Sequence, residues 1–233
     1  DGALKRLAEM EGIDPTNRWA AAERYFLTKD AKAKAELERM LGGQSQDAID
    51  VSIFYRNLNK WKEAVEILRL VEGKNSKDVW GTPAEYYYTL AYCAKRSGEE
   101  GASAEYLKKA KASAKNIDRF PYREASEAVL KEALERDPKD AVAAYLLGCL
   151  QYNLGKGKEA IGAWEQAVAA NAEEFSSQRA LGLAYGEQGY DVALAGKHLE
   201  KAVELNPSHV RTMNDLSALY SRAGRFDEQV AVL

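Results

Sequence analysis

The chain has 233 residues, with 33 basic and 36 acidic side chains and a formal net charge of −3. This balance gives no electrostatic footprint for nucleic acid or an anionic membrane, so we expect neither as a partner. No apolar stretch is long enough to insert into a membrane, and two cysteines are too few for a disulfide framework.

Helix-forming residues dominate the composition. Alanine, leucine, glutamate and lysine are abundant, and the whole chain contains only five prolines. No alternating apolar pattern bounded by hairpin turns is present, which is the pattern that would indicate β-strands. The sequence therefore predicts an all-α protein.

The first helical patterns of the chain are weak. Residues 2–12 are typical of one helix, which we interpret as the second helix of a pair. A short helix pair is expected over residues 18–27 and 31–41, with Gly42-Gly43 as its stop signal.

Two clearer helix pairs follow. Residues 45–73 carry apolar side chains at the spacing of two packed helices. The next pair begins at Thr82-Pro83-Ala84-Glu85, which has the sequence of a capping box with proline at the first helical position. We expect the side chains of this tetrapeptide to cap the helix.

The regular spacing breaks near Asn116. Successive pairs start at Ala84 and Ala141, 57 residues apart, which is one period of 34 plus room for a single extra helix. We therefore expect a three-part organisation: divergent helix pairs over residues 1–115, an irregular spacer and single helix over residues 116–140, and regular pairs over residues 141–233.

Residues 140–172 form the clearest unit. Asp140 is a good N-cap for a first helix, and Leu154-Gly155 ends that helix. Gly148 and Ala160 are small enough to let two helix backbones approach closely, and Trp164 is expected to fill the seam between the helices. This stretch predicts two antiparallel helices.

The same pattern recurs at nearly constant spacing. Gly182 follows Gly148 by 34 positions, and Gly224 follows Gly189 by 35. The chain here resembles the tetratricopeptide repeat family, whose period is about 34 residues. The resemblance is carried by Leu147-Gly148, Leu181-Gly182-x2-Tyr185, Leu216-x3-Tyr220, Ala160-x3-Trp164-x2-Ala167 and Ala195-x3-Leu199-x2-Ala202-x4-Pro207. It implies a right-handed α-solenoid of antiparallel helix pairs that serves as a protein-interaction scaffold.

A second resemblance covers the last half of the chain. The segments in question are Phe120-Pro121-Tyr122-Arg123, Tyr145-x2-Gly148, Glu159-Ala160-Ile161-x2-Trp164 and Arg179-Ala180-Leu181. Their order is similar to the C-terminal repeat region of large bacterial DUF5107 proteins. This resemblance implies the alternative function, an accessory repeat domain packed in cis against a carbohydrate-active domain of a larger bacterial protein.

The tetratricopeptide resemblance also implies a binding face. In that family, positions 2, 5, 9, 12 and 13 of each first helix line a concave groove, which here include Leu183, Gly186, Glu187, Ala218 and Arg222. Tyrosine and arginine give large contact area and forked hydrogen bonding, which suits a peptide or a partner helix. We take as groove residues Tyr88, Tyr92, Lys95, Arg96, Tyr145, Tyr152, Asn153, Arg179, Arg211 and Asn214.

A packing role for these tyrosines is the competing interpretation, because the same family uses tyrosine between helices, as at Tyr185 and Tyr220. The family's carboxylate clamp of a lysine and an asparagine is not reproduced, since Tyr145 and Cys149 stand in those positions. Binding of a chaperone tail is therefore disfavoured.

The sequence predicts no catalytic site, cofactor or metal. Cys93 and Cys149 have no histidine on a neighbouring helix, and His198 and His209 have no ligand residues at metal-binding spacing. The glycines stand singly at repeat turns and do not form a phosphate-binding loop.

The expected partner is a protein or peptide in trans, or another domain of the same protein in cis. Self-association through the ends of the array is a third alternative. We favour the cytoplasm. We leave export open because the chain begins at Asp1 rather than at methionine, and we expect it to be an excised segment.

Overall fold

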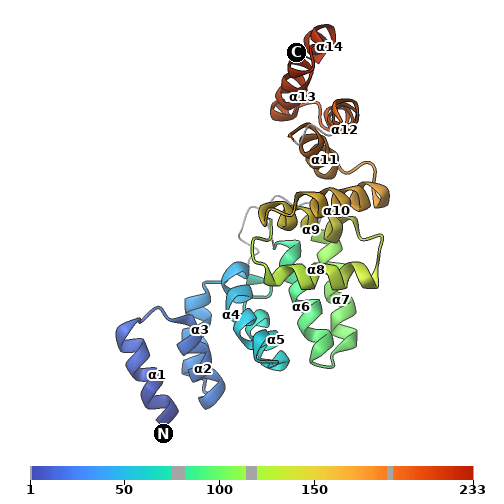
Figure 1. Ribbon diagram of the computed structural model, residues 1–233. Helices are drawn as coiled ribbons and strands as arrows, with labels where there is room; N and C mark the ends of the chain where they lie inside the picture. Colours follow the sequence, from blue (N-terminus) through green and yellow to red (C-terminus); the bar gives the residue numbers. More distant parts are fainter. Residues whose placement is uncertain (1, 75–81, 114–119, 188–190, 233) are drawn as a thin grey trace. The chain divides into compact units, whose positions relative to one another are not determined.

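A computed structural model describes residues 2–74, 82–113, 120–187 and 191–232. Every regular element in these residues is a helix, and the helices follow one another in packed pairs (Figure 1). The all-α class of antiparallel helix pairs is confirmed. The helices are α1 (Gly2–Ile13), α2 (Arg18–Thr28), α3 (Ala31–Leu41), α4 (Ser45–Asn57), α5 (Trp61–Arg69), α6 (Ala84–Arg96), α7 (Glu100–Ala112), α8 (Ala125–Arg136), α9 (Ala141–Asn153), α10 (Gly157–Ala170), α11 (Phe175–Glu187), α12 (Val192–Leu205), α13 (Val210–Arg222) and α14 (Phe226–Val232).

The chain divides into two compact units, Asp1–Arg119 and Phe120–Leu233. The first contains α1 to α7, with α2 packed on α3, α4 on α5 and α6 on α7. The second contains α8 to α14, with pairs α9 and α10, α11 and α12, and α13 and α14. Residues 114–119, where we expected the spacer to begin, lie outside the described part of the chain.

The second unit is built as a solenoid. The second helix of each pair packs on the first helix of the next pair, α10 on α11 and α12 on α13. The single helix α8 packs on α9 in the same way, so it occupies the place of a second helix. In the first unit α1 packs on α2 and α5 on α6.

Close approach of two backbones defines the pair of α9 and α10. A Cβ atom added to Gly148 would lie 2.5 Å from the Trp164 ring. The indole Nε1 of Trp164 also donates a hydrogen bond to the backbone oxygen of Tyr145, at 3.2 Å. Asp140 caps α9 by accepting from the Ala143 amide at 3.1 Å, and Gly155 ends the helix turn with a φ of +75°. The predicted seam and caps of this unit are confirmed.

The next pairs repeat this construction. A Cβ atom at Gly182 would lie 2.6 Å from Leu199 of the paired helix. Between pairs, the Tyr185 hydroxyl donates to Glu165, twenty residues earlier, at 2.5 Å. The Tyr220 hydroxyl bonds to Glu200 in the same relation. These two tyrosines therefore join successive pairs.

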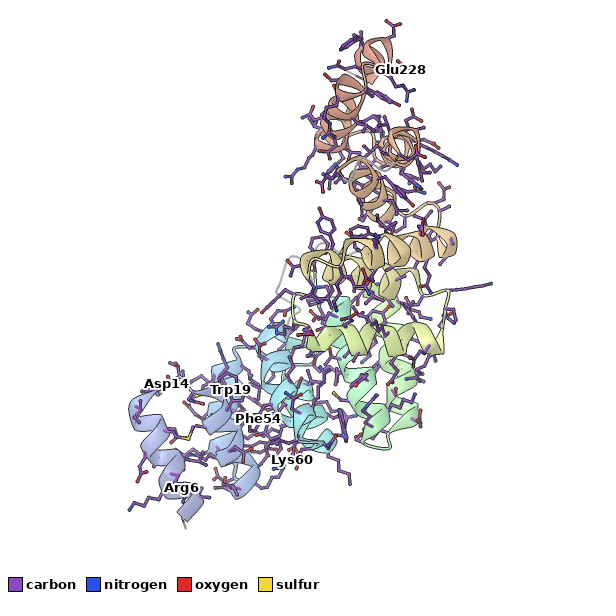
Figure 2. The ribbon with its side chains drawn as sticks, viewed as in Figure 1. Arg6, Asp14, Trp19, Phe54, Lys60 and Glu228 are labelled. Atoms are coloured by element: carbon purple, nitrogen blue, oxygen red, sulfur yellow. The ribbon has the colours of Figure 1, made fainter. Side chains whose placement is uncertain are left out.

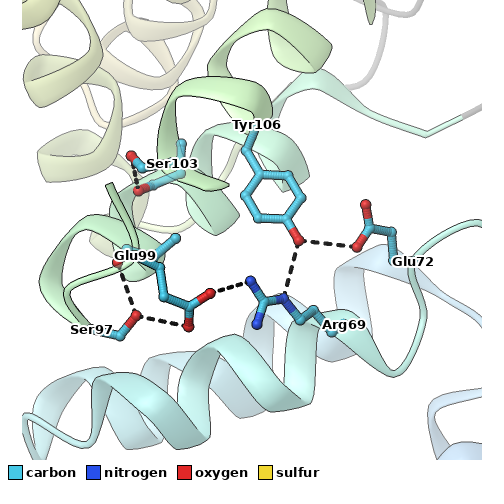
Figure 3. A network of polar contacts seen from close by, with 8 residues as sticks. Arg69, Glu72, Ser97, Glu99, Ser103 and Tyr106 are labelled. Atoms are coloured by element: carbon cyan, nitrogen blue, oxygen red, sulfur yellow. Dashed lines mark hydrogen bonds and ion pairs between the residues drawn. The ribbon is translucent and has the colours of Figure 1, made fainter. Parts of the chain in front are cut away.

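The first unit joins its pairs by a different polar network (Figure 3). The Nε of Arg69, at the end of α5, donates to the Tyr106 hydroxyl of α7 at 3.1 Å, and its Nη2 lies 2.5 Å from Glu99. The Tyr106 hydroxyl in turn donates to Glu72 at 3.1 Å. Burial raises the pKa of Tyr106. This network ties α7 back to α5.

The capping box expected at the start of α6 does not form. The N-cap residue is Pro83, which has no side chain that can accept a hydrogen bond, and no side-chain cap is present. The helix begins at Ala84, so the proline lies one position before the first helical residue. Glu85 is buried and accepts a hydrogen bond from Gln46 of α4 at 3.3 Å instead.

Candidate binding groove

In the first unit, three of the predicted groove residues lie on the last turns of α6. Tyr92 is half-buried, and the guanidinium carbons of Arg56 and Arg96 lie 5.0 Å and 3.5 Å from its ring centroid. Trp61 contacts the same ring edge-on at 6.0 Å. Lys95, in the last turn of the same helix, is half-buried. Two cations therefore lie close to the Tyr92 ring, a favourable arrangement for an aromatic side chain.

Two of the predicted tyrosines lie inside the protein. Tyr88 is 1% exposed and Tyr145 is 5% exposed. Burial raises the pKa of Tyr145, whose hydroxyl lies beside Cys149. Because a buried ring offers little contact area to a partner, we place these two tyrosines in the packing of their units and build the groove from other residues.

Exposed apolar side chains also occur in the first unit. Trp19 of α2 is 47% exposed and Phe54 of α4 is 40% exposed (Figure 2). The two helices contact each other, and Glu23 of α2 accepts a hydrogen bond from Tyr55 of α4 at 2.8 Å. Single exposed apolar residues are common on protein surfaces, and nothing in the structure shows what would cover these.

The second unit contains a pocket between two first helices. It has a volume of about 250 Å³ and lies between α11 and α13, with α12 behind it. Its apolar part is formed by Leu183, Leu199 and Leu219, and its polar part includes Glu187, Asp215 and Arg222. The pocket therefore lies on the face that we predicted to be the groove.

Small residues keep this pocket open. A Cβ atom at Gly186 would lie 3.3 Å from Leu219 and 3.9 Å from the Nη2 of Arg222. Ala218 lines the pocket from α13 and is exposed. Larger side chains at these two positions would fill the space between the helices.

Two predicted groove residues bond to the next first helix along the chain. The Tyr152 hydroxyl of α9 donates to Glu187 of α11. Arg179 of α11 forms an ion pair with Asp215 of α13 at 2.5 Å. These bonds place Tyr152 and Arg179 beside the pocket, where Tyr152 donates a hydrogen bond to one acidic side chain of the lining and Arg179 neutralises the other.

The exposed face of α13 carries two further predicted residues of this unit. Arg211 and Asn214 are exposed, and they continue in line with Ala218 and Arg222, at helical spacings of three and four residues. Among the ion pairs of the described residues, none includes Arg211 or Arg222. Asn153 is exposed at the end of α9. The stripe of Arg211, Asn214, Ala218 and Arg222, here called the α13 stripe, borders the pocket.

His198, His209 and the Cys149 thiol take part in packing or helix-capping contacts. His198 contacts Gln178 at 2.7 Å and stacks on Tyr185, and burial lowers its pKa. His209 accepts from the Thr212 amide at the start of α13. Burial raises the pKa of the Cys149 thiol to about 12, so this thiol is protonated at neutral pH.

In the described residues, no group of three histidine, cysteine, aspartate or glutamate side chains is placed to hold a metal ion. No helix in the same residues is long and apolar enough to cross a membrane.

Sequence reasoning did not identify the partners of the groove residues. Glu187 follows Tyr152 by 35 positions and Asp215 follows Arg179 by 36, close to one repeat period. A search for complementary polar residues one period apart would have found both pairs.

Comparisons with known proteins give distant similarities. No family model matches the chain. Cellulose synthase operon protein C of Pseudomonas fluorescens (strain SBW25) is 25% identical over 202 residues, a match that covers 84% of this chain. The chain spans only 14% of that relative's length.

Solved structures give weaker likenesses. A crystal structure of MamA protein has a TM-score of 0.45 and 20% identity, over 82% of this chain and 88% of that one. YrrB, described as a TPR protein with an unusual peptide-binding site, has a TM-score of 0.40 and 13% identity, over 90% of this chain and 96% of that one.

Proposed function

We propose that this chain is a non-catalytic protein-interaction module and that the groove between α11 and α13 binds an extended segment of a partner protein. The pocket of about 250 Å³ on the face formed by first helices is the observation that carries the proposal. A pocket of this size accepts one apolar side chain, and the polar residues around it can hydrogen-bond a peptide backbone.

The construction of the groove supports this role. Its walls are two packed helices, which hold the lining side chains more rigidly than loops would. Glycine at position 186 and alanine at position 218 leave the space unfilled. The bonds of Tyr152 and Arg179 brace successive first helices, so the groove is formed before a ligand arrives.

Selection from an unbiased displayed peptide library, with the whole chain as bait, tests the proposal. Binders should lose affinity at least about tenfold for Ala218→Trp, because the indole fills the pocket. Ala193→Trp, an exposed alanine of α12 outside the pocket, is the matched control and should bind normally. Binders that tolerate Ala218→Trp, or the absence of any binder, would refute groove recognition.

A second candidate is an accessory repeat segment packed in cis against a carbohydrate-active domain. The match to cellulose synthase operon protein C, a much longer protein, favours it. Exposed apolar side chains also support it, Ile13 at the end of α1 at 87% and Phe226 and Val230 of α14 at 64% and 73%. A photo-cross-linking residue at position 226 in the natural protein should capture a carbohydrate-active domain of the same polypeptide. Capture of solvent or lipid alone would contradict this candidate.

A further inference from the structure

We infer that the groove of the second unit selects an acidic extended peptide, in which an apolar residue lies between two carboxylates five positions apart. This inference rests on the proposed function and adds the chemistry of the partner. It follows from the α13 stripe, which places Arg211 and Arg222 on either side of the pocket position Ala218.

The charged residues of the groove determine which ligand it favours. Four charged residues lie at the pocket or on the stripe, and the two acidic ones already have donors, because Tyr152 bonds to Glu187 and Arg179 to Asp215. Arg211 and Arg222 take part in none of the ion pairs found among the described residues. The groove therefore has two cations to offer to a ligand, and carboxylates suit their forked donors.

Arg222 is directed across the pocket. Its Nη2 would lie 3.9 Å from a Cβ atom built on Gly186, which belongs to the opposite helix α11 (Figure 1). Glycine at this position leaves room for the guanidinium and for a ligand beside it. A peptide that enters the pocket therefore meets Arg222 at one end of the groove.

The spacing follows from helix geometry. Arg211 and Ala218 are seven positions apart in α13, a rise of about 10 Å along the helix axis. Ala218 and Arg222 are four positions apart, a rise of about 6 Å. An extended peptide advances about 3.3 Å per residue. A ligand that lies along α13 therefore places a carboxylate, an apolar side chain three residues later and a second carboxylate two residues after that, or the reverse order. The leucine-lined pocket receives the apolar side chain.

Fluorescence anisotropy with synthetic peptides and the whole chain tests the inference. The probe is a ten-residue peptide of glycine, serine and alanine that carries aspartate, leucine and aspartate at relative positions 0, 3 and 5, together with the peptide of reversed order. Controls replace both aspartates by asparagine, replace leucine by serine, or bring the aspartates to a spacing of two. We expect the asparagine peptide to bind at least about tenfold more weakly, and rising salt to weaken only the acidic peptide.

Charge substitutions in the protein complete the test. Arg211→Ala and Arg222→Ala should each weaken the acidic peptide about threefold and leave the asparagine peptide unchanged. Lys197→Ala removes an exposed cation of α12 outside the groove and should have no effect. Equal binding of both peptides, an equal effect of Lys197→Ala, or no binding by either aspartate order would overturn the inference.

The two proposals fail separately. If the displayed library gives binders that Ala218→Trp abolishes but that carry no acidic residues, the groove binds peptides and the acidic preference is wrong. If the library gives no groove-dependent binder, the proposed function fails and the acidic preference falls with it.

Discussion

The two units close their helix pairs at the same repeat position by different means. In the α9–α10 and α11–α12 pairs of the second unit the position is occupied by glycine, and Trp164 packs directly on the backbone of Gly148. In the α6–α7 pair of the first unit it is occupied by Ala91, and Ser103 of α7 donates a hydrogen bond to the Ala91 carbonyl at 2.8 Å (Figure 3). The packing of the Trp164 ring on the backbone requires a residue without a Cβ atom. The hydrogen bond from Ser103 to the Ala91 carbonyl leaves space for the alanine methyl group.

This difference predicts how sensitive each unit is to a substitution at this repeat position. Interiors of proteins are close-packed, so an added methyl group that meets a ring at 2.5 Å must displace the ring or the helix. The side chain concerned, Trp164, is 5% exposed and also bonded through its Nε1 to the Tyr145 carbonyl. The second unit should therefore tolerate change at this position much less than the first.

The largest predicted effect is that of Gly148→Ala. It should lower the free energy of unfolding of the second unit by about 2 to 3 kcal/mol, because overpacking outweighs the higher helix propensity of alanine. Urea denaturation gives the change in stability. Labelling of Cys149 during urea exposure should accelerate, while labelling of Cys93 in the first unit should stay the same, because the two thiols lie in different compact units.

A glycine with open space provides the control. Gly162 lies inside α10, and a Cβ atom there would meet nothing within 4 Å. Gly162→Ala should stabilise the chain by about 0.5 to 1 kcal/mol. If Gly148→Ala behaved like Gly162→Ala, the close contact with Trp164 would not be the determinant of this pair.

The next effect concerns the tyrosines that join successive pairs of the second unit. Tyr185→Phe removes the hydroxyl that donates to Glu165 and should cost about 1 to 2 kcal/mol at pH 7. Urea denaturation of the variant and the parent measures this cost. Tyr220→Phe should behave in the same way, because Tyr220 makes the corresponding bond to Glu200.

The same bond has a defined pH dependence. Burial, and then the hydrogen bond to Glu165, raises the pKa of Tyr185 from its ordinary value of 10.0 to about 12. Because the folded protein disfavours the phenolate, the stabilisation is complete below pH 10 and is lost as the pH rises from 10 to 12. The cost of Tyr185→Phe should therefore shrink over this range. An equal cost at pH 8 and pH 12 would contradict the assigned bond.

The regular repeat made part of this construction predictable. The positions of Gly148, Gly182 and Trp164 follow from a period of 34 residues together with the need for small residues where helices cross. Asp140 was predictable as a cap because aspartate is a favoured N-cap residue and stands directly before a helical pattern. The start of α6 was not, because a proline next to a threonine fits two registers of the cap, and only the fold decides between them.

The groove was less predictable than the fold. Family positions bring Tyr88 and Tyr92 to the same helix, yet one is buried and the other half-buried, since burial depends on what the neighbouring helices carry. The same positions do not reveal that Arg179 is paired while Arg222 is not. Pairing depends on contacts across helices, and those need the arrangement of at least two repeats.

The smallest predicted effect tests how the single helix α8 is held. Glu127 of α8 lies 2.9 Å from Lys131, one turn later, and 2.7 Å from Lys156, which precedes α10. Hydrogen bonds from these two lysines lower the pKa of Glu127 from 4.5 to about 2. Partly exposed ion pairs stabilise only modestly, so Glu127→Gln should cost about 0.5 to 1 kcal/mol at pH 7.

The sign of the pH dependence is opposite to that of the tyrosines. The folded state favours the Glu127 carboxylate, so its stabilisation is complete above about pH 4.5 and is lost as the pH falls towards 2. Urea midpoints of Glu127→Gln and of the parent should therefore converge between pH 4.5 and pH 2. Glu135→Gln, an exposed residue of the same helix, should leave the midpoint unchanged at every pH. A cost of Glu127→Gln that persisted at pH 2 would show that packing, and not the ion pairs, fixes this side chain.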